Sequence, residues 1–182
     1  MRRSSDKQDV ASAGSFRGYL SKSIRNYGAK TLVCCLGNPI GGDDGIGFAV
    51  GRHLKRVLPN RDFEVIPEYA GSALGLVLEL SGWRKVYIID AVMTGKMPAG
   101  TVRLFTEKEI CAKMKPNSFH GLELPQALIM GRKLKINLPR SVKLVGIEIE
   151  PVVSFGNKLS PALNERLAHI RAEVRSIIAQ DG

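Results

Sequence analysis

Short apolar runs alternate with amphipathic stretches from residue 31 onward. The run at 31–36 is continuous and ends at Gly37, which is typical of a strand covered on both faces. A similar buried run at 86–89 stops at Asp90. Further strands are expected at 63–66, at 101–105, which alternates like a more exposed strand, and at 142–149, broken at Gly146.

Between these runs, apolar residues recur at helical spacing. The stripe at 46–58 ends at Pro59, and Asp43 or Asp44 is placed to cap its start. Other helices are expected at 74–80, at 122–130, and after the cap and first-turn pair Ser160-Pro161. The apolar stripe of that last helix comprises Leu163, Leu167, Ile170, Val174 and Ile177.

Strands alternating with helices predict an α/β fold. We expect a single three-layer domain, with a mostly parallel twisted sheet and helices on both faces. A length of 182 residues fits one domain with a sizeable core.

The cysteine count and the apolar runs bear on the compartment. Cys34 and Cys35 are neighbours in an apolar run, and Cys111 is the third cysteine, so no disulfide framework is expected. No run approaches the roughly 18 apolar residues of a membrane span. These features favour a cytoplasmic protein without membrane insertion or export, and we expect a monomer.

Half of the net charge of +10 lies in the first 30 residues, where seven basic and two acidic side chains give +5. We expect residues 1–30 to form a flexible basic extension and residues 31–182 to form the domain. An electrostatic arm for nucleic acid is the alternative. We disfavour it, because no aromatic interleaving or nucleic-acid motif accompanies the charge.

Polar residues follow three predicted elements at positions where ligands gather in open α/β sheets. They are the Gly-rich segment 37–47, Asp90 after a buried strand, and the segment 117–120 before a helix. Asp44, Asp90 and His120 would offer two carboxylates and one imidazole to a common point. That set suits a divalent ion such as nickel, zinc or manganese. The ordinary alternatives are a helix-capping aspartate and a structural histidine, and His53 and His169 are interpreted as structural.

Other chemistries fit the sequence less well. The charges of Asp43 and Asp44 would repel phosphate in a dinucleotide loop, and no Gly-Lys-Ser or Gly-Lys-Thr follows. Neither a His-Glu-x-x-His motif nor a Ser or Cys triad signature is present. Cys34 and Cys35 are interpreted as core residues.

Several segments resemble, in order, the signatures of the hydrogenase maturation proteases. The most specific is Leu36-Gly-Asn-Pro-Ile-Gly-Gly-Asp-Asp-Gly-Ile-Gly47. Val86-Tyr-Ile-Ile-Asp-Ala-Val92 and Ser118-Phe-His-Gly-Leu122 resemble the second and third signatures. Weaker matches are Gly71-Ser-Ala-Leu74, Gly146-Ile-Glu-Ile-Glu-Pro151 and Leu159-Ser-Pro161. The resemblance runs from about residue 31 to residue 178.

The resemblance implies an endopeptidase that removes the C-terminal extension of a nickel-iron hydrogenase large-subunit precursor after nickel insertion. Asp44, Asp90 and His120 would contact nickel supplied by the substrate, with zinc or cadmium as substitutes. Asp44 and Asp90 would be catalytic, either through a metal ion that polarises the carbonyl or activates water, or as general bases. A non-catalytic nickel-sensing chaperone of the precursor is the alternative function.

Overall fold

One mixed sheet organises the residues that the computed structural model describes, which are 30–113, 123–151 and 156–180. Within them the strand order is β2-β1-β3-β5-β4. The parallel strands are β1 (Thr31–Leu36), β2 (Phe63–Tyr69), β3 (Lys85–Val92) and β5 (Ser141–Glu148). β4 (Val102–Thr106) joins β5 in the antiparallel sense at one edge. The predicted α/β class with a mostly parallel sheet is confirmed.

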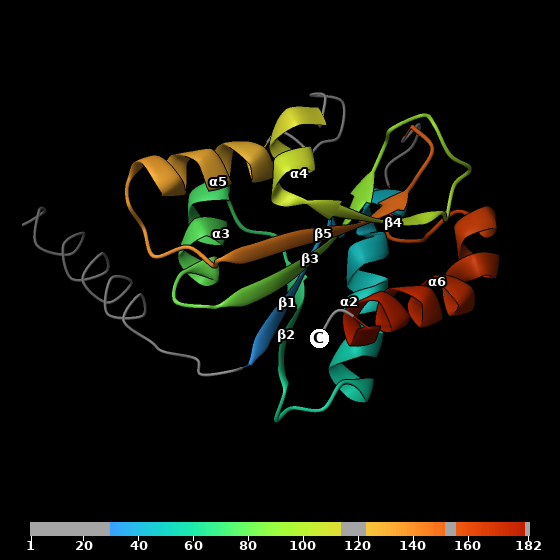
Figure 1. Ribbon diagram of the computed structural model, residues 1–182. Helices are drawn as coiled ribbons and strands as arrows, with labels where there is room; N and C mark the ends of the chain where they lie inside the picture. The colour runs from blue at the N-terminus through green and yellow to red at the C-terminus, as the bar shows by residue number, and fades with distance from the viewer. Residues whose placement is uncertain (1–29, 114–122, 152–155, 181–182) are drawn as a thin grey trace, which may run out of the picture.

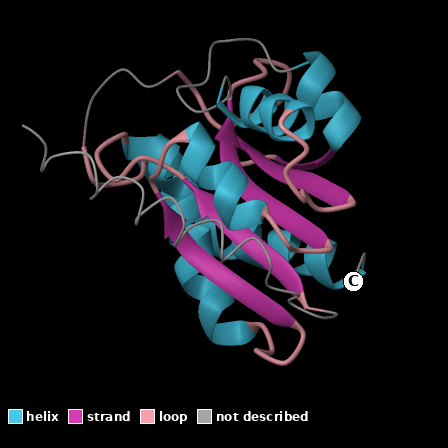
Figure 2. Cartoon of the chain, turned by 90° about the vertical axis from the view of Figure 1, so that its left-hand side faces the viewer, coloured by secondary structure: helices cyan, strands magenta, loops and turns pink. Residues whose placement is uncertain are grey.

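Helices cover both faces of the sheet (Figures 1 and 2). The short 3-10 helix η1 (Gly42–Gly45) leads into α2 (Ile46–Val57), which packs on one face with α6 (Pro161–Gln180). The opposite face carries α3 (Ala73–Leu80), α4 (Glu107–Lys113) and α5 (Glu123–Lys133). Each face has its own apolar core, so the domain has three layers. None of the helices in these ranges combines the length and the apolar character that a membrane span needs.

Several strands run further than expected. β2 continues through Pro67 to Tyr69, which an edge strand tolerates because one side of its backbone has no ladder to complete. β3 continues past Asp90 to Val92, because β5 pairs with it along its whole length.

The predicted break at Gly146 is wrong, since β5 is continuous there. A Cβ at position 146 would lie 2.8 Å from the Phe105 ring and 2.9 Å from a Val92 methyl group. Glycine at this position therefore makes room for neighbouring side chains rather than ending the strand.

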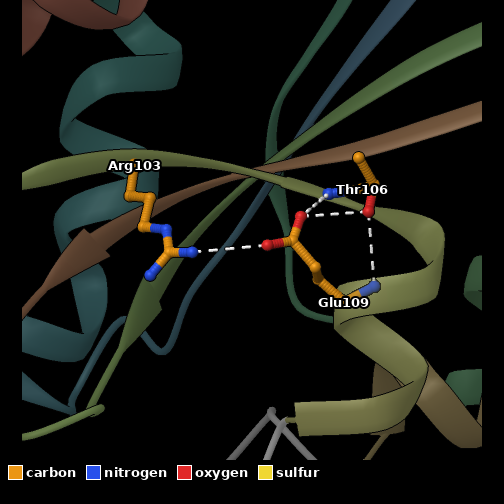
Figure 3. Close-up of polar contacts among 3 residues, drawn as sticks. All are labelled: Arg103, Thr106 and Glu109. Atoms are coloured by element: carbon orange, nitrogen blue, oxygen red, sulfur yellow. Dashed lines mark hydrogen bonds and ion pairs between the residues drawn. The ribbon is translucent and has the colours of Figure 1, made fainter.

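The sequence pattern did not reveal α4, which begins directly after β4. Its start is a capping box: the Glu109 amide donates to Thr106 Oγ1 (3.3 Å), and the Thr106 amide donates to Glu109 Oε2 (3.0 Å) (Figure 3). Arg103 on β4 also forms an ion pair with Glu109 at 3.3 Å. This network fixes the direction in which the chain leaves the sheet edge.

The two predicted helix starts have opposite outcomes. The cap of α6 is confirmed, because the Leu163 amide donates to Ser160 Oγ at 3.4 Å. The cap of α2 is not an aspartate: Gly45 occupies that position and makes no side-chain cap. Asp44 and Asp43 instead lie one and two residues before it, within η1.

Candidate active site

The carboxyl ends of β1 and β3 form the switch point of the sheet. β1 lies between β2 and β3, so the chain leaves β1 toward β2 on one side and later crosses to β3 on the other. Loops diverge at such a point and leave room for a ligand. Asp44 follows β1 and Asp90 lies near the end of β3, so both predicted carboxylates belong to this edge.

Asp44 is held by a tight turn after β1. Its amide donates to the Gly41 carbonyl at 3.2 Å, and its carbonyl accepts from the Asn38 amide at 3.3 Å. The Asn38 side chain in turn accepts from the Ile40 amide at 3.1 Å. With 6% of its surface exposed, Asp44 is a buried acidic residue, and its helix η1 contacts β3.

Asp90 is buried more completely, at 2% exposure. Its Oδ1 accepts from the Ala91 amide at 2.9 Å. The alternation of β3 places it on the same face as Ile88 and Val92, the face covered by α3, α4 and α5. Its strand neighbour on β5 is Gly146, so no side chain of that neighbour stands beside the carboxylate.

Asp90 also affects the two cysteines of β1. Burial raises the pKa of both thiols, and the charges of Glu79 and Asp90 raise that of Cys34 further, while those of Cys34 and Asp90 raise that of Cys35. Both cysteines are fully buried in the two cores, as predicted. They are neutral thiols packed as apolar groups, not nucleophiles.

Gly47 fixes the spacing between the two aspartates. A Cβ at this position would overlap the carbonyl oxygen of Leu36 and lie 3.1 Å from that of Ile89. The first turn of α2 therefore lies directly against the ends of β1 and β3. Asp44 precedes this contact by three residues and Asp90 follows Ile89, so both carboxylates are held by rigid elements.

Asp43 has a different function from its neighbour. Its Oδ1 accepts from the Ser160 amide at 2.6 Å. Two backbone hydrogen bonds form a short bridge beside it. The Gly42 amide donates to the Gly156 carbonyl at 2.7 Å, and the Gly156 amide donates to the Ile40 carbonyl at 2.9 Å. Asp43 thus ties the loop after β1 to the start of α6, while Asp44 remains at the switch point.

His120, the third predicted member, lies outside the described residues, so its place at the site stays a prediction. The helix that follows it, α5, begins at Glu123 and packs on the face that carries Asp90. In the described ranges, no three His, Cys, Asp or Glu side chains come together as a metal site. Two buried carboxylates suit a divalent cation or proton transfer, since buried charges are paired or coordinate metals. A third donor would have to come from His120 or from a substrate.

Sequence reasoning missed Glu148, another buried carboxylate at this edge. It is 1% exposed and accepts from the Thr94 amide (2.7 Å), the Thr94 hydroxyl (2.7 Å) and the Gly95 amide (2.8 Å). Glu148 therefore anchors the loop that follows β3. The available signal was its register: it shares the inward face of β5 with Val142 and Leu144.

The other two histidines, His53 and His169, lie away from Asp44 and Asp90. His53 is half-buried on α2, where burial and the nearby charges of Arg171, Arg56 and Arg175 lower its pKa. His169 on α6 is 70% exposed at its side chain and lies 3.6 Å from Glu173. Neither is part of the candidate active site.

The described residues form an α/β domain with two buried aspartates, Asp44 and Asp90, near the switch point of its sheet. A family model, HycI, described as hydrogenase maturation protease, matches residues 49–177. The chain is also 30% identical over 147 residues to Protein FrxA of Pyrococcus furiosus, covering 76% of this chain and 98% of that protein. The chain belongs to the hydrogenase maturation protease family.

Solved structures with the same fold include the hydrogenase maturating endopeptidase HybD from E. coli. It aligns with a TM-score of 0.69 and 23% identity, over 84% of this chain and 94% of that one. The [NiFe] hydrogenase maturation protease HybD from Thermococcus kodakarensis aligns with a TM-score of 0.59 and 24% identity, over 81% and 98%. At these identities the likeness establishes the fold.

Proposed function

We propose that this protein is an endopeptidase that removes the C-terminal extension of a nickel-iron hydrogenase large-subunit precursor after nickel has been inserted. The observation that carries the proposal is the pair of buried carboxylates, Asp44 and Asp90, at the switch point of a chain that belongs to this family. Two proteins with the same fold, the hydrogenase maturating endopeptidase HybD from E. coli and the [NiFe] hydrogenase maturation protease HybD from Thermococcus kodakarensis, support the same substrate class.

In this proposal the nickel belongs to the substrate. Asp44, Asp90 and His120 contact the ion that the precursor already holds and thereby orient the scissile peptide. Carboxylate and imidazole donors suit nickel, and zinc or cadmium could take its place. Substrate donors would complete the coordination. This fits the described part of the chain, in which no three His, Cys, Asp or Glu side chains come together as a metal site.

The reaction is hydrolysis of one peptide bond. Water adds to the scissile carbonyl carbon, the carbon–nitrogen bond breaks, and the leaving amine takes up a proton. Asp44 or Asp90 can accept the proton of the attacking water as a general base. A metal ion at the site would polarise the carbonyl or activate the water instead.

The buried setting of the two aspartates supports either chemistry. Asp44 is held by the tight turn after β1 and Asp90 by its place in the paired strand β3, and α2 contacts the ends of both strands. Groups held in this way need little rearrangement when charge develops in the transition state. The free thiols Cys34, Cys35 and Cys111 fit a reducing compartment, so we propose that the reaction takes place in the cytoplasm.

The test is the intact mass of the cognate precursor, nickel-loaded and nickel-free, before and after incubation with this protein. We expect loss of one defined C-terminal peptide from the loaded form alone. Asp90→Asn and Asp44→Asn should bind the loaded precursor and leave its mass unchanged. A stable complex with an unchanged mass for the wild-type protein would instead support a nickel-sensing chaperone. Equal cutting by wild type and both variants would exclude the proposed site.

A further inference from the structure

The helices α2 and α6 pack together on the face of the sheet opposite α3 and α5 (Figure 1). Four of their basic side chains lie close enough for their charges to act on one another. His53 and Arg56 lie on α2, and Arg171 and Arg175 lie on α6. We name this group the α2–α6 basic cluster. Two acidic residues on or in contact with these helices pair with other basic side chains: Glu68 with Arg52 at 2.5 Å, and Glu173 with His169 at 3.6 Å.

The members of the cluster repel one another. Burial lowers the pKa of Arg171, and the charges of Arg56 and Arg52 lower it further. The charges of Arg171, Arg56 and Arg175 act in the same way on His53. Arg56 and Arg175 are exposed and form no ion pair within the described ranges. The two exposed arginines of the cluster therefore have no counterion in the described part of the chain.

Arg171 is also incompletely bonded. Its Nη2 donates to the Ala49 carbonyl at 3.1 Å, which anchors α6 to α2. Its Nε is buried and has no hydrogen-bond acceptor among the described residues. A buried donor without a partner and a set of like charges both destabilise a fold. Such local conflicts are expected at functional positions.

We propose that the α2–α6 basic cluster docks an acidic segment of the hydrogenase precursor. This inference rests on the proposed function, which supplies a protein as the substrate. His53 and Arg56 are three residues apart and Arg171 and Arg175 four, so each pair covers about one helical turn. A patch of that size fits two or three carboxylates of one segment. A nucleic-acid backbone would be tracked by a longer basic stripe.

Arg56, the exposed arginine of the cluster on α2, lies away from the candidate active site, although Arg171 reaches back to Ala49. Gly47 marks the end of α2 that touches the site, and Arg56 is nine residues further along the helix, a rise of roughly 14 Å. The segment bound there is therefore not the scissile peptide. A docking contact at this distance steers and holds the precursor but takes no part in the cleavage step. Loss of the contact should therefore raise KM and leave kcat unchanged.

The experiment compares two double variants that lower the net charge equally. Arg56→Gln with Arg175→Gln removes the exposed half of the cluster, and Lys108→Gln with Lys133→Gln removes two exposed charges from α4 and α5 on the other face. Binding of the loaded precursor is measured by calorimetry at several salt concentrations, and cleavage by intact mass. We expect the arginine variant to bind about tenfold more weakly, with a shallower salt dependence and an unchanged kcat. The lysine variant should match wild type.

The failures of this inference and of the proposed function are distinguishable. If wild type cleaves the precursor and the arginine variant binds and cleaves it equally well, the docking role is overturned and the endopeptidase stands. If wild type binds through the cluster without cleaving, the docking role stands and the endopeptidase is overturned. Binding of mixed-sequence duplex DNA is measured as well. If the arginine variant loses affinity for the DNA and keeps full affinity for the precursor, the docking role is also overturned. The melting temperature controls for folding, and removing repelling charges should not lower it.

Discussion

Gly47 packs against Leu36 so closely that any side chain at position 47 would overlap the Leu36 carbonyl oxygen. The same missing side chain lets α2 approach Ile89, the residue before Asp90. One backbone contact therefore determines how far the loop bearing Asp44 stands from the strand bearing Asp90. Neither carbonyl can move away, because Leu36 and Ile89 lie within the paired strands β1 and β3.

Gly47→Ala should destabilise the protein by about 3 kcal/mol, because the clash is with backbone rather than with a flexible side chain. Urea unfolding measures the change. Gly156→Ala is the matched control, since a Cβ there meets no atom within 4 Å. If Gly47→Ala unfolds at the same urea concentration as the control, α2 does not hold the site in the way described.

The adjacent aspartates 43 and 44 should separate stability from catalysis. Asp43→Ala loses the bond to the Ser160 amide and should lower stability by about 2 kcal/mol while leaving cleavage close to wild type. Asp90→Asn keeps an oxygen that can accept from the Ala91 amide, so stability should hold while kcat falls by about 10² to 10⁴. Unfolding curves and mass-based cleavage rates are measured side by side. The opposite pattern, with Asp43→Ala inactive and Asp90→Asn active, would reassign the site.

The sequence predicted the sheet well because its strands are buried. Two strands, the unbroken apolar run at 31–36 and the run ending at Asp90, are apolar on both faces. Such strands must be covered by helices on both sides, which is typical of a parallel sheet. Asp44 and Asp90 could then be assigned to the same edge of the sheet, because parallel strands end at a common edge. His120 was chosen by the same logic and stays a prediction.

Other features depend on contacts that a linear pattern does not contain. The sequence pointed to Asp44 for the site, but it did not show that Asp43 accepts from the amide of Ser160, more than a hundred residues later. The register of Glu148 places it on the inward face of β5, but the pattern does not show that Thr94 and Gly95 donate to its carboxylate. The helix α4 was hidden because it follows β4 without an intervening loop.

Glu148→Gln should destabilise the protein by about 3 kcal/mol, because a buried carboxylate that accepts three hydrogen bonds is replaced by an amide with donors of its own. Thermal unfolding measures this loss, with the exposed Glu150→Gln as the control. Hydrogen exchange at Thr94 and Gly95 should accelerate in the first variant alone. Unchanged exchange at both amides would show that Glu148 does not anchor this loop.

Glu109→Ala should remove the capping box of α4 and lower stability by about 1 kcal/mol. The amide of Thr106 loses its acceptor, and Arg103 loses its ion pair. Urea unfolding compares this variant with Lys108→Ala, an exposed neighbour on the same helix. Equal stability of the two variants would mean that the network in Figure 3 does not stabilise the helix start.

His53 should make the protein less stable in mild acid. Its pKa is lowered in the folded state by burial and by Arg171, Arg56 and Arg175, so the unfolded chain takes up the proton more readily. The stability that His53 contributes is therefore present above its ordinary pKa of about 6.5 and is lost as the pH falls through the lowered value.

Arg56→Gln removes one of the repelling charges and should raise the pKa of His53, which NMR titration of its ring protons measures. Arg61→Gln is the matched control, because Arg61 pairs with Asp62 and is not among the charges that act on His53. His53→Gln should flatten the fall of unfolding free energy between pH 7 and pH 5. If Arg56→Gln and Arg61→Gln leave the His53 titration equally unchanged, Arg56 does not act on His53, and the mutual repulsion that supports the docking role is absent.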